Sequence, residues 1–267
     1  MRTHRQEGFQ LKKLGVIGGM GPEATSYFYA KVIEQTKADS DQQHIDMIIL
    51  SHASMPDRTE AIRTGHRQAF LKEAIRDAMI LEQLGVSQIA IPCNTSHAFL
   101  PEIQAAVRVP ILNMVKESVY SIQKQQKPIK KTGILATDGT LQCGLYQRAF
   151  EEAGIHTAVP EASTQRLLMS LIYDDVKSGS YNNRWKFDRA YESLLRQGCQ
   201  AVLLACTELS VFQQYHTLPP NCIDAMDILV KESIRRSGAR LRDETDRPGI
   251  CPPEKQAEQP CKRSNMA

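Results

Sequence analysis

The sequence predicts an α/β protein of two similar lobes, each a parallel sheet between helices, related by a pseudo-twofold axis. Short apolar runs alternate with longer segments of helical period along the chain, a pattern typical of β-α units. Related stretches occur in both halves of the sequence. The length of 267 residues is sufficient for two such lobes.

The expected strands are short apolar runs bounded by polar or glycine residues. They are residues 13–18, 45–50, 88–92, 109–112, 132–136, 200–205 and 221–224. Between them, residues 67–84 carry apolar side chains at helical spacing, and Gly85 suits a helix C-cap. We expect this helix to cover one face of a sheet.

An internal repeat singles out two of the cysteines. Residues 14–17 (LGVI) resemble 132–135 (TGIL), and residues 88–95 (QIAIPCNT) resemble 200–207 (QAVLLACT). The two matches have nearly the same spacing, which indicates lobes related by duplication. Cys93 and Cys206 therefore occupy equivalent positions in the two halves.

The repeat also suggests domain boundaries. We expect a first lobe of residues 12–112 and 225–237, a second lobe of residues 113–224, and a tail of residues 238–267. The tail has mixed charge, several prolines and no apolar periodicity, so the sequence predicts that it is disordered.

Composition makes several classes of function poor first guesses. The net charge is +3, from 33 basic and 30 acidic side chains, too balanced to predict binding to nucleic acid or to a membrane surface. The sequence contains neither an apolar run of membrane-spanning length nor a signal peptide, so we expect a cytoplasmic protein. The seven cysteines include no C-x-x-C pair, which predicts free thiols and no metal site.

Each repeated cysteine ends an expected strand and precedes polar residues that suit the start of a helix. Asn94 and Thr95 follow Cys93, and Thr207 follows Cys206. The positive end of a helix favours a thiolate. A single such cysteine is more often a buried core residue, but a duplicated pair where open α/β sheets place their active sites favours a function.

Two equivalent thiols fit one kind of chemistry. Inversion of a carbon centre requires removal of a proton from one face and delivery to the other, and two opposed acid/base groups achieve this without moving the substrate. A hydrolase would instead need one cysteine and a histidine. His97 is the histidine near Cys93 in sequence, and we expect it to be a packed or solvent-facing helix residue outside the catalytic set.

Residues 18–25 (GGMGPEAT) form a glycine-rich loop after the first strand. Residues 19–24 match G-x-G-x-x-A, a dinucleotide motif, but no acidic residue follows the second strand to bind a ribose. The loop more readily brings backbone close to a small carboxylate, although a plain tight turn is an alternative. Thr137 begins the equivalent segment of the second half, where it suits a carboxylate site or a helix cap.

Two basic residues are weaker candidates for a binding site. Arg58 follows the second strand and has the geometry to bind a carboxylate through two hydrogen bonds. Lys177 lies near a helix end beside acidic neighbours, where lysines commonly stabilise the terminus.

Five motifs together resemble the aspartate/glutamate racemase family, and aspartate racemases in particular. They are residues 18–25 (GGMGPEAT), 56–59 (PDRT), 92–99 (PCNTSHAF), 135–140 (LATDGT) and 205–208 (ACTE). The resemblance covers roughly residues 12 to 236, in the same order as in the family.

The resemblance implies an active site in the cleft between two lobes, no pyridoxal phosphate or other cofactor, no metal, and a homodimer. It implies that Cys93 and Cys206 are the catalytic thiols. It also implies that Met20, Arg58, Asn94, Thr95 and Lys177 surround an amino-acid substrate, with Arg58 and Lys177 as candidates to hold its carboxylates. We expect Thr137 and Thr207, from the equivalent segments of the second half, to contact the substrate as well.

Small departures leave the substrate open. Residues 51–55 (SHASM) lack the asparagines of close aspartate racemases, and Ala205 stands where glycine is common. Racemisation of aspartate or glutamate is the first hypothesis, with a broad-specificity amino-acid racemase as its variant. A non-catalytic protein that binds an amino acid or dicarboxylate is the alternative of another class, and a dinucleotide oxidoreductase is a third.

Overall fold

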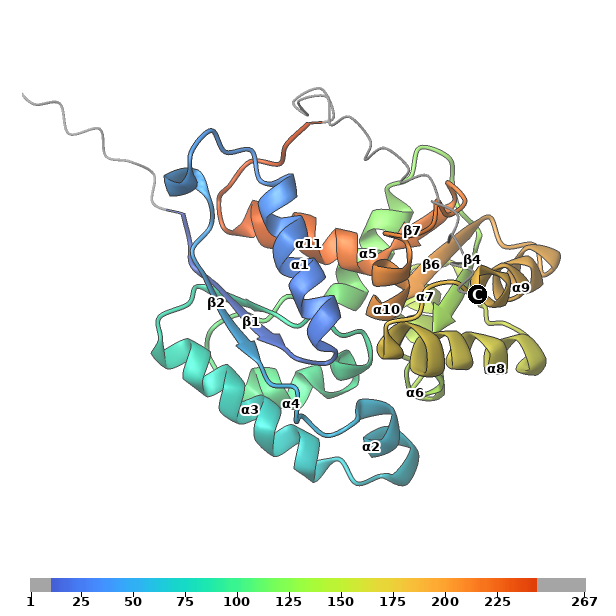
Figure 1. The fold of residues 1–267 in the computed structure, drawn as a ribbon, viewed down its shortest axis with the longest axis horizontal. Coiled ribbons are helices and arrows are strands. Elements are labelled where there is room, and N and C mark those ends of the chain that lie inside the picture. Colours follow the sequence, from blue (N-terminus) through green and yellow to red (C-terminus); the bar gives the residue numbers. More distant parts are fainter. Residues whose placement is uncertain (1–10, 244–267) are drawn as a thin grey trace, which may run out of the picture.

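The computed structural model describes residues 11–243 and contains two parallel sheets that lie side by side (Figure 1). The first sheet has the order β2-β1-β3 and the second the order β5-β4-β6-β7. Their bounds are β1 (Leu14–Gly18), β2 (Met47–Ser51), β3 (Gln88–Ala90), β4 (Lys131–Ala136), β5 (His156–Ala158), β6 (Ala201–Ala205) and β7 (Cys222–Asp224). In both halves the first strand lies between the second and the third, which confirms the predicted fold class.

Two strands differ from the expectation. Residues 109–112 do not form a strand; they contribute one isolated parallel bridge, between Ile111 and Ile89. Pro110 has no N–H group to donate to a ladder, so pairing is limited to Ile89 N to Pro110 O and Leu112 N to Ile89 O, at 2.9 and 2.8 Å. The strand β5 was not expected, because its three residues lie at a sheet edge and include the exposed His156.

Eleven α-helices connect and cover the strands of the described chain. They are α1 (Pro22–Gln35), α2 (Arg58–Thr64), α3 (Gln68–Gln83), α4 (Leu100–Ala105), α5 (Met114–Gln123), α6 (Asp138–Gln142), α7 (Leu145–Glu152), α8 (Ala162–Ser170), α9 (Arg184–Arg196), α10 (Thr207–Phe212) and α11 (Ala225–Arg236). Shorter turns are η1 (Asp41–Gln43), η2 (Thr95–Phe99), the π-helical η3 (Leu171–Asp175) and η4 (Val176–Ser178). Helix α3 confirms the helix expected at 67–84, and Gly85 follows it with φ +71°.

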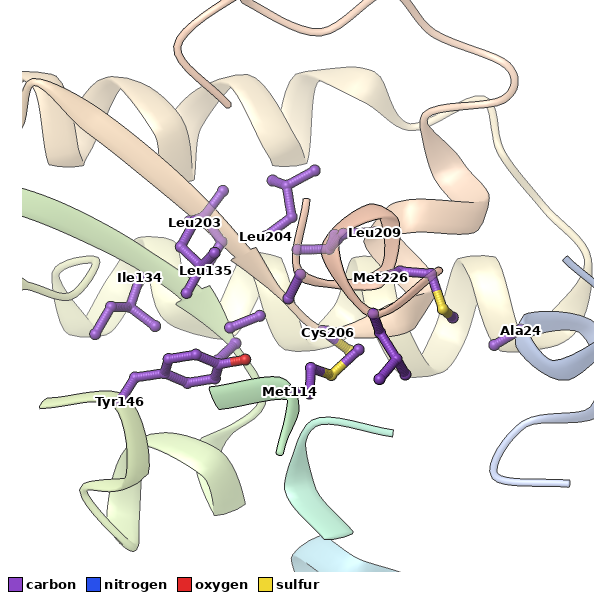
Figure 2. Close-up of a cluster of buried hydrophobic side chains, with 14 of the residues drawn as sticks. Ala24, Met114, Ile134, Leu135, Tyr146, Leu203, Leu204, Cys206, Leu209 and Met226 are labelled. Atoms are coloured by element: carbon purple, nitrogen blue, oxygen red, sulfur yellow. The ribbon is translucent and has the colours of Figure 1, made fainter. Parts of the chain in front are cut away.

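Alternation along β1 divides the core of the first lobe into two clusters. Leu14 and Val16 belong to one cluster with α1 and α5, whereas Ile17 belongs to the other with α3, as expected when successive side chains point to opposite faces. The first cluster continues through α11 into both faces of β4 and β6, where Figure 2 shows Leu135, Leu203 and Cys206. The two sheets are therefore held together by one continuous apolar core.

The end of the described chain returns to the first half. Helix α11 packs against α1 and α5, and Leu241 forms an antiparallel bridge with Thr36. The start of the expected tail, residues 238–243, thus contacts residues 35–37, while residues 244–267 lie outside the described residues. No helix within residues 11–243 is both long enough and apolar enough to cross a membrane.

The loop after β1 is held close to the end of β2. Gly19 has φ +89°, and a Cβ there would lie 2.4 Å from the carbonyl carbon of His52. His52 N in turn donates to Gly18 O at 3.2 Å. Only glycine satisfies both the backbone conformation and this close approach.

We expect Gly19→Ala to destabilise the fold more than Gly85→Ala. Gly85 also has a positive φ, but its Cβ would have no atom within 4 Å, so that variant should cost about 1 kcal/mol from backbone strain alone. Gly19→Ala adds the overlap with His52 and should cost about 1–3 kcal/mol more. Urea denaturation compares the two variants, and equal costs would contradict the close packing.

Candidate active site

Cys93 and Cys206 lie just beyond the carboxyl ends of β3 and β6 and line the same small pocket. Each thiol residue is 5% exposed, so both are buried to the same degree. Cys206 is the N-cap residue of α10, whereas Cys93 precedes Asn94, the N-cap residue of η2. Each cysteine thus lies at the carboxyl edge of its own parallel sheet, and the two edges meet at this pocket.

The pocket gathers every residue that the sequence proposed for the site. Its lining consists of Met20, Arg58, Thr59, Cys93, Asn94, Thr95, Thr137, Tyr173, Lys177, Cys206, Thr207 and Glu208. These side chains leave only about 10 Å³ of free space, roughly what one water requires. The structure is therefore closed around the thiols.

Three lining residues were not proposed from the sequence: Thr59, Tyr173 and Glu208. Thr59 and Glu208 lie within two positions of Arg58 and Cys206, so adjacency alone could have suggested them. Tyr173 comes from η3, and π-helical turns are frequent at functional sites. No sequence pattern marks such a turn, because it depends on a backbone hydrogen-bond shift.

Arg58 is buried at the start of α2, and two of its five N–H groups donate to backbone carbonyls. Its Nη atoms donate to Met20 O at 3.3 Å and Pro56 O at 3.2 Å, while its Nε has no acceptor among the described residues. Burial alone would lower the pKa of the Arg58 guanidinium. The nearby Cys93 and Asp57 raise this pKa by more than burial lowers it, so the net shift is upward. Arg58 is thus a fixed cation with a free N–H group in the pocket.

Asn94 supplies a second free donor. The Tyr146 hydroxyl donates to Asn94 Oδ1 at 2.5 Å, which leaves the amide nitrogen as the remaining polar atom. Asn94 Nδ2 is buried and has no acceptor within residues 11–243. Buried donors are almost always paired, but Asn94 Nδ2 and Arg58 Nε are two unpaired donors on residues that line the pocket.

Cys206 lies beside a buried ion pair. Its Sγ donates to Glu208 Oε2 at 3.0 Å, and Lys177 Nζ lies 2.8 Å from Glu208 Oε1. Burial raises the pKa of Cys206 well above its usual value, and the Glu208 carboxylate raises it further. The expectation that a helix start favours the thiolate is wrong for Cys206, because burial and Glu208 outweigh the six-residue helix α10.

Hydroxyl groups connect the two lobes at the same place. Thr95 Oγ1 lies 3.1 Å from Thr137 Oγ1 and 2.9 Å from Thr140 Oγ1, and the Tyr173 hydroxyl donates to Thr59 Oγ1 at 3.1 Å. Thr137 also caps α6 by accepting from Thr140 N. Thr137 is therefore a helix cap that also faces the pocket.

Both ring nitrogens of His97 form hydrogen bonds with backbone groups. Its Nδ1 lies 2.9 Å from Cys93 O, and its Nε2 accepts from Met114 N at 3.1 Å. Burial lowers the pKa of the ring, so His97 is neutral. It holds the loop of Cys93 against the start of α5 and has no ring nitrogen left for a thiol.

A larger cavity of about 360 Å³ adjoins the pocket. The two spaces share Met20, Arg58, Lys177 and Glu208. The rest of the cavity wall consists of small or apolar residues together with the acidic side chains Glu23 and Asp57. A ligand group that passes between Arg58 and Lys177 would enter this cavity.

The fold agrees with comparisons to known proteins. The family model described as Asp/Glu/Hydantoin racemase matches residues 17–233. The chain is 29% identical to the broad specificity amino-acid racemase RacX of Bacillus subtilis, over 83% of this chain and 96% of that protein.

Solved structures give the same result. The aspartate racemase of Picrophilus torridus superposes with a TM-score of 0.76 at 29% identity, over 86% of this chain and 96% of that one. An aspartate racemase homologue from Pyrococcus horikoshii superposes with a TM-score of 0.68 at 26% identity, over 85% of this chain and 100% of that one. The chain belongs to the Asp/Glu/hydantoin racemase family and is an enzyme of the amino-acid racemase class.

We expect Tyr146→Phe to lower the free energy of unfolding by about 1–3 kcal/mol, because the buried Asn94 carbonyl loses its donor. Tyr191→Phe is the matched control, since the Tyr191 hydroxyl donates to Asn221 Oδ1 at 2.7 Å in a half-buried position. There water replaces the lost donor, and the cost should be roughly 1 kcal/mol or less. Chemical denaturation measures both, and equal losses would contradict a buried, oriented Asn94.

Proposed function

We propose that the enzyme racemises an amino acid by a two-base reaction in which Cys93 and Cys206 act on opposite faces of the α-carbon. The observation that carries the proposal is the convergence of the duplicated cysteines on one buried pocket that also holds two unpaired donors. A pair of opposed thiols supplies a base and an acid at once. Nothing in this reaction requires a further nucleophile.

The proposed steps conserve all protons. The thiolate of one cysteine takes the α-proton, and the electron pair left on the α-carbon delocalises into the substrate carboxylate. The other cysteine gives its thiol proton to the opposite face, which regenerates the amino acid with inverted configuration. Arg58 Nε and Asn94 Nδ2 support the intermediate, because donors aimed at developing negative charge stabilise it most in a water-poor site.

Substrate binding requires the pocket to open. An amino acid does not fit into about 10 Å³ of free space, so the lobes or the loops that carry the site must separate and close again. Closure then excludes water from the carbanion. The hydroxyl contacts between Thr95, Thr137 and Thr59 are the interlobe contacts that such a motion would break first.

Aspartate or glutamate is the substrate that we favour. Arg58 and Lys177 stand at the boundary between the pocket and the adjoining cavity, where they would meet the side-chain carboxylate. The relative from Picrophilus torridus is an aspartate racemase by name.

One observation favours a broader range of amino acids. Lys177 is already paired with Glu208 at 2.8 Å, so the pair presents little net charge to a substrate side chain. The adjoining cavity of about 360 Å³ also has space for side chains longer than that of aspartate. The relative RacX has broad specificity by name.

Exchange of the α-proton tests the proposed reaction. In D₂O, we expect loss of the α-proton NMR signal of aspartate or glutamate with inversion, and a decrease of about 10²–10⁴-fold in Cys93→Ala and in Cys206→Ala. Cys199→Ala is the matched control, because Cys199 is equally buried and lies away from the pocket. Stabilisation by aspartate without any exchange would instead identify a binding protein.

Lys177→Met tests the substrate range. If Lys177 holds a side-chain carboxylate, we expect KM for aspartate and glutamate to rise about tenfold or more, with little change for a neutral amino acid such as alanine. Steady-state rates with these three substrates measure the difference. An equal rise in KM for all three substrates would show that Lys177 contacts only the α-amino or α-carboxylate group, which every amino acid has.

A further inference from the structure

The two thiols have matched burial but opposite electrostatic surroundings. Cys93 and Cys206 are each 5% exposed. Cys206 Sγ donates to the carboxylate of Glu208 at 3.0 Å, whereas Cys93 lies near the buried guanidinium of Arg58 and raises its pKa. The site is therefore not electrostatically symmetric, although the sequence repeat is.

Glu208 is kept ionised by its neighbours. Burial alone would raise the pKa of Glu208, but the cation of Lys177 and the hydrogen bond from Cys206 lower it below its usual value. Lys177 is held in place by the Tyr173 ring, with Nζ 5.2 Å from the ring centre. A carboxylate accepts hydrogen bonds and donates none, so its contact with Cys206 at 3.0 Å requires the proton to be on sulfur.

The other charged and titratable groups around Cys206 do not cancel Glu208. Lys177 lowers the pKa of the thiol, but the net direction is upward. Tyr173 is neutral, because burial raises the pKa of its hydroxyl to about 12. Arg58 is drawn to Cys93 more strongly than to Glu208.

We propose that Glu208 is a positioning residue that holds Cys206 as the protonated thiol in the substrate-free enzyme. The inference deepens the two-base function proposed above and rests on it. The resting enzyme then has its acid assigned before substrate arrives. The enantiomer whose α-proton Cys206 must remove reacts only after that thiol has lost its proton.

The catalytic cycle must reset this arrangement. In one turnover Cys93 gains the α-proton and Cys206 loses its thiol proton. The product enzyme thus carries a Cys206 thiolate next to the Glu208 carboxylate, which like-charge repulsion disfavours. Return of one proton from the Cys93 thiol to Cys206, directly or through solvent, restores the resting form.

The rate of alkylation of each cysteine depends on the protonation state of its thiol and can be measured without catalytic turnover. Iodoacetamide reacts with the thiolate, forming an S–C bond and releasing iodide. The full-length protein is treated with limiting iodoacetamide between pH 6 and 10, and mass spectrometry of peptides gives a separate rate for each cysteine. In the wild type we expect Cys206 to react slowly near pH 7.5 and to become faster only toward pH 10.

Substitution of Glu208 identifies the cause. Glu208→Gln keeps the shape but removes the charge, so we expect Cys206 to react about tenfold or more faster and its pH profile to move to lower pH, with Cys93 nearly unchanged. Glu208→Asp is the matched control, because it changes the side chain at the same position but keeps the negative charge. It should leave Cys206 about as slow as in the wild type, whereas mere loosening of the packing would make Cys206 faster in both variants.

The remaining outcomes are also decisive. The buried Cys199 reports the fold, since its rapid alkylation marks an unfolded variant; in that case the wild type and Glu208→Asp decide. Rapid alkylation of wild-type Cys206 near pH 7.5, or a folded Glu208→Gln that leaves Cys206 unchanged, would overturn the assignment. Faster alkylation of Cys206 in Glu208→Gln, with no α-proton exchange in the wild type, would retain the role of Glu208 and reject the racemase reaction.

Discussion

The apolar core shared by the two sheets is the constraint on which the site depends. Leu14 and Val16 of the first sheet pack in the same cluster as Leu135 and Leu203 of the second. Because all strands are parallel within each sheet, this packing brings the carboxyl ends of β3 and β6 to one pocket. Neither lobe alone could place a thiol on both sides of an α-carbon.

Burial then sets the chemistry of the groups brought together. The pocket contains two cations, one carboxylate and two thiols within a small space, where charges interact far more strongly than in water. A buried ion pair such as Lys177–Glu208 contributes little net stability. The Glu208 carboxylate also accepts a hydrogen bond from Cys206 Sγ at 3.0 Å, so the pair acts on that thiol.

Much of the fold followed from local patterns. The alternation of apolar runs and helical segments predicted the α/β class, six of the expected strands and the helix at 67–84. Pro110 limited the expected strand at 109–112 to one bridge, which only the neighbouring β3 could reveal. The edge strand β5 carries no apolar signal and was missed for that reason.

The candidate site was predictable in part. The repeat selected Cys93 and Cys206, and family resemblance selected Arg58 and Lys177, all of which line the pocket. Glu208 was visible beside Cys206, but its contact with that thiol depends on the side chain turning inward toward Lys177. Burial and the contact with Glu208 raise the pKa of Cys206, against the lowering expected at a helix start. Contacts of this kind between side chains cannot be inferred from the spacing of residues in the sequence.

The distribution of deuterium between the two enantiomers tests the central claim most directly. L-aspartate, or the best substrate found, is incubated with the enzyme in D₂O, and the enantiomers are separated after a few per cent conversion. Two thiols on opposite faces predict that the product carries deuterium at the α-carbon while the remaining substrate stays almost free of it. Early deuterium in both enantiomers to the same extent would contradict the account, because it requires a single base that serves both faces.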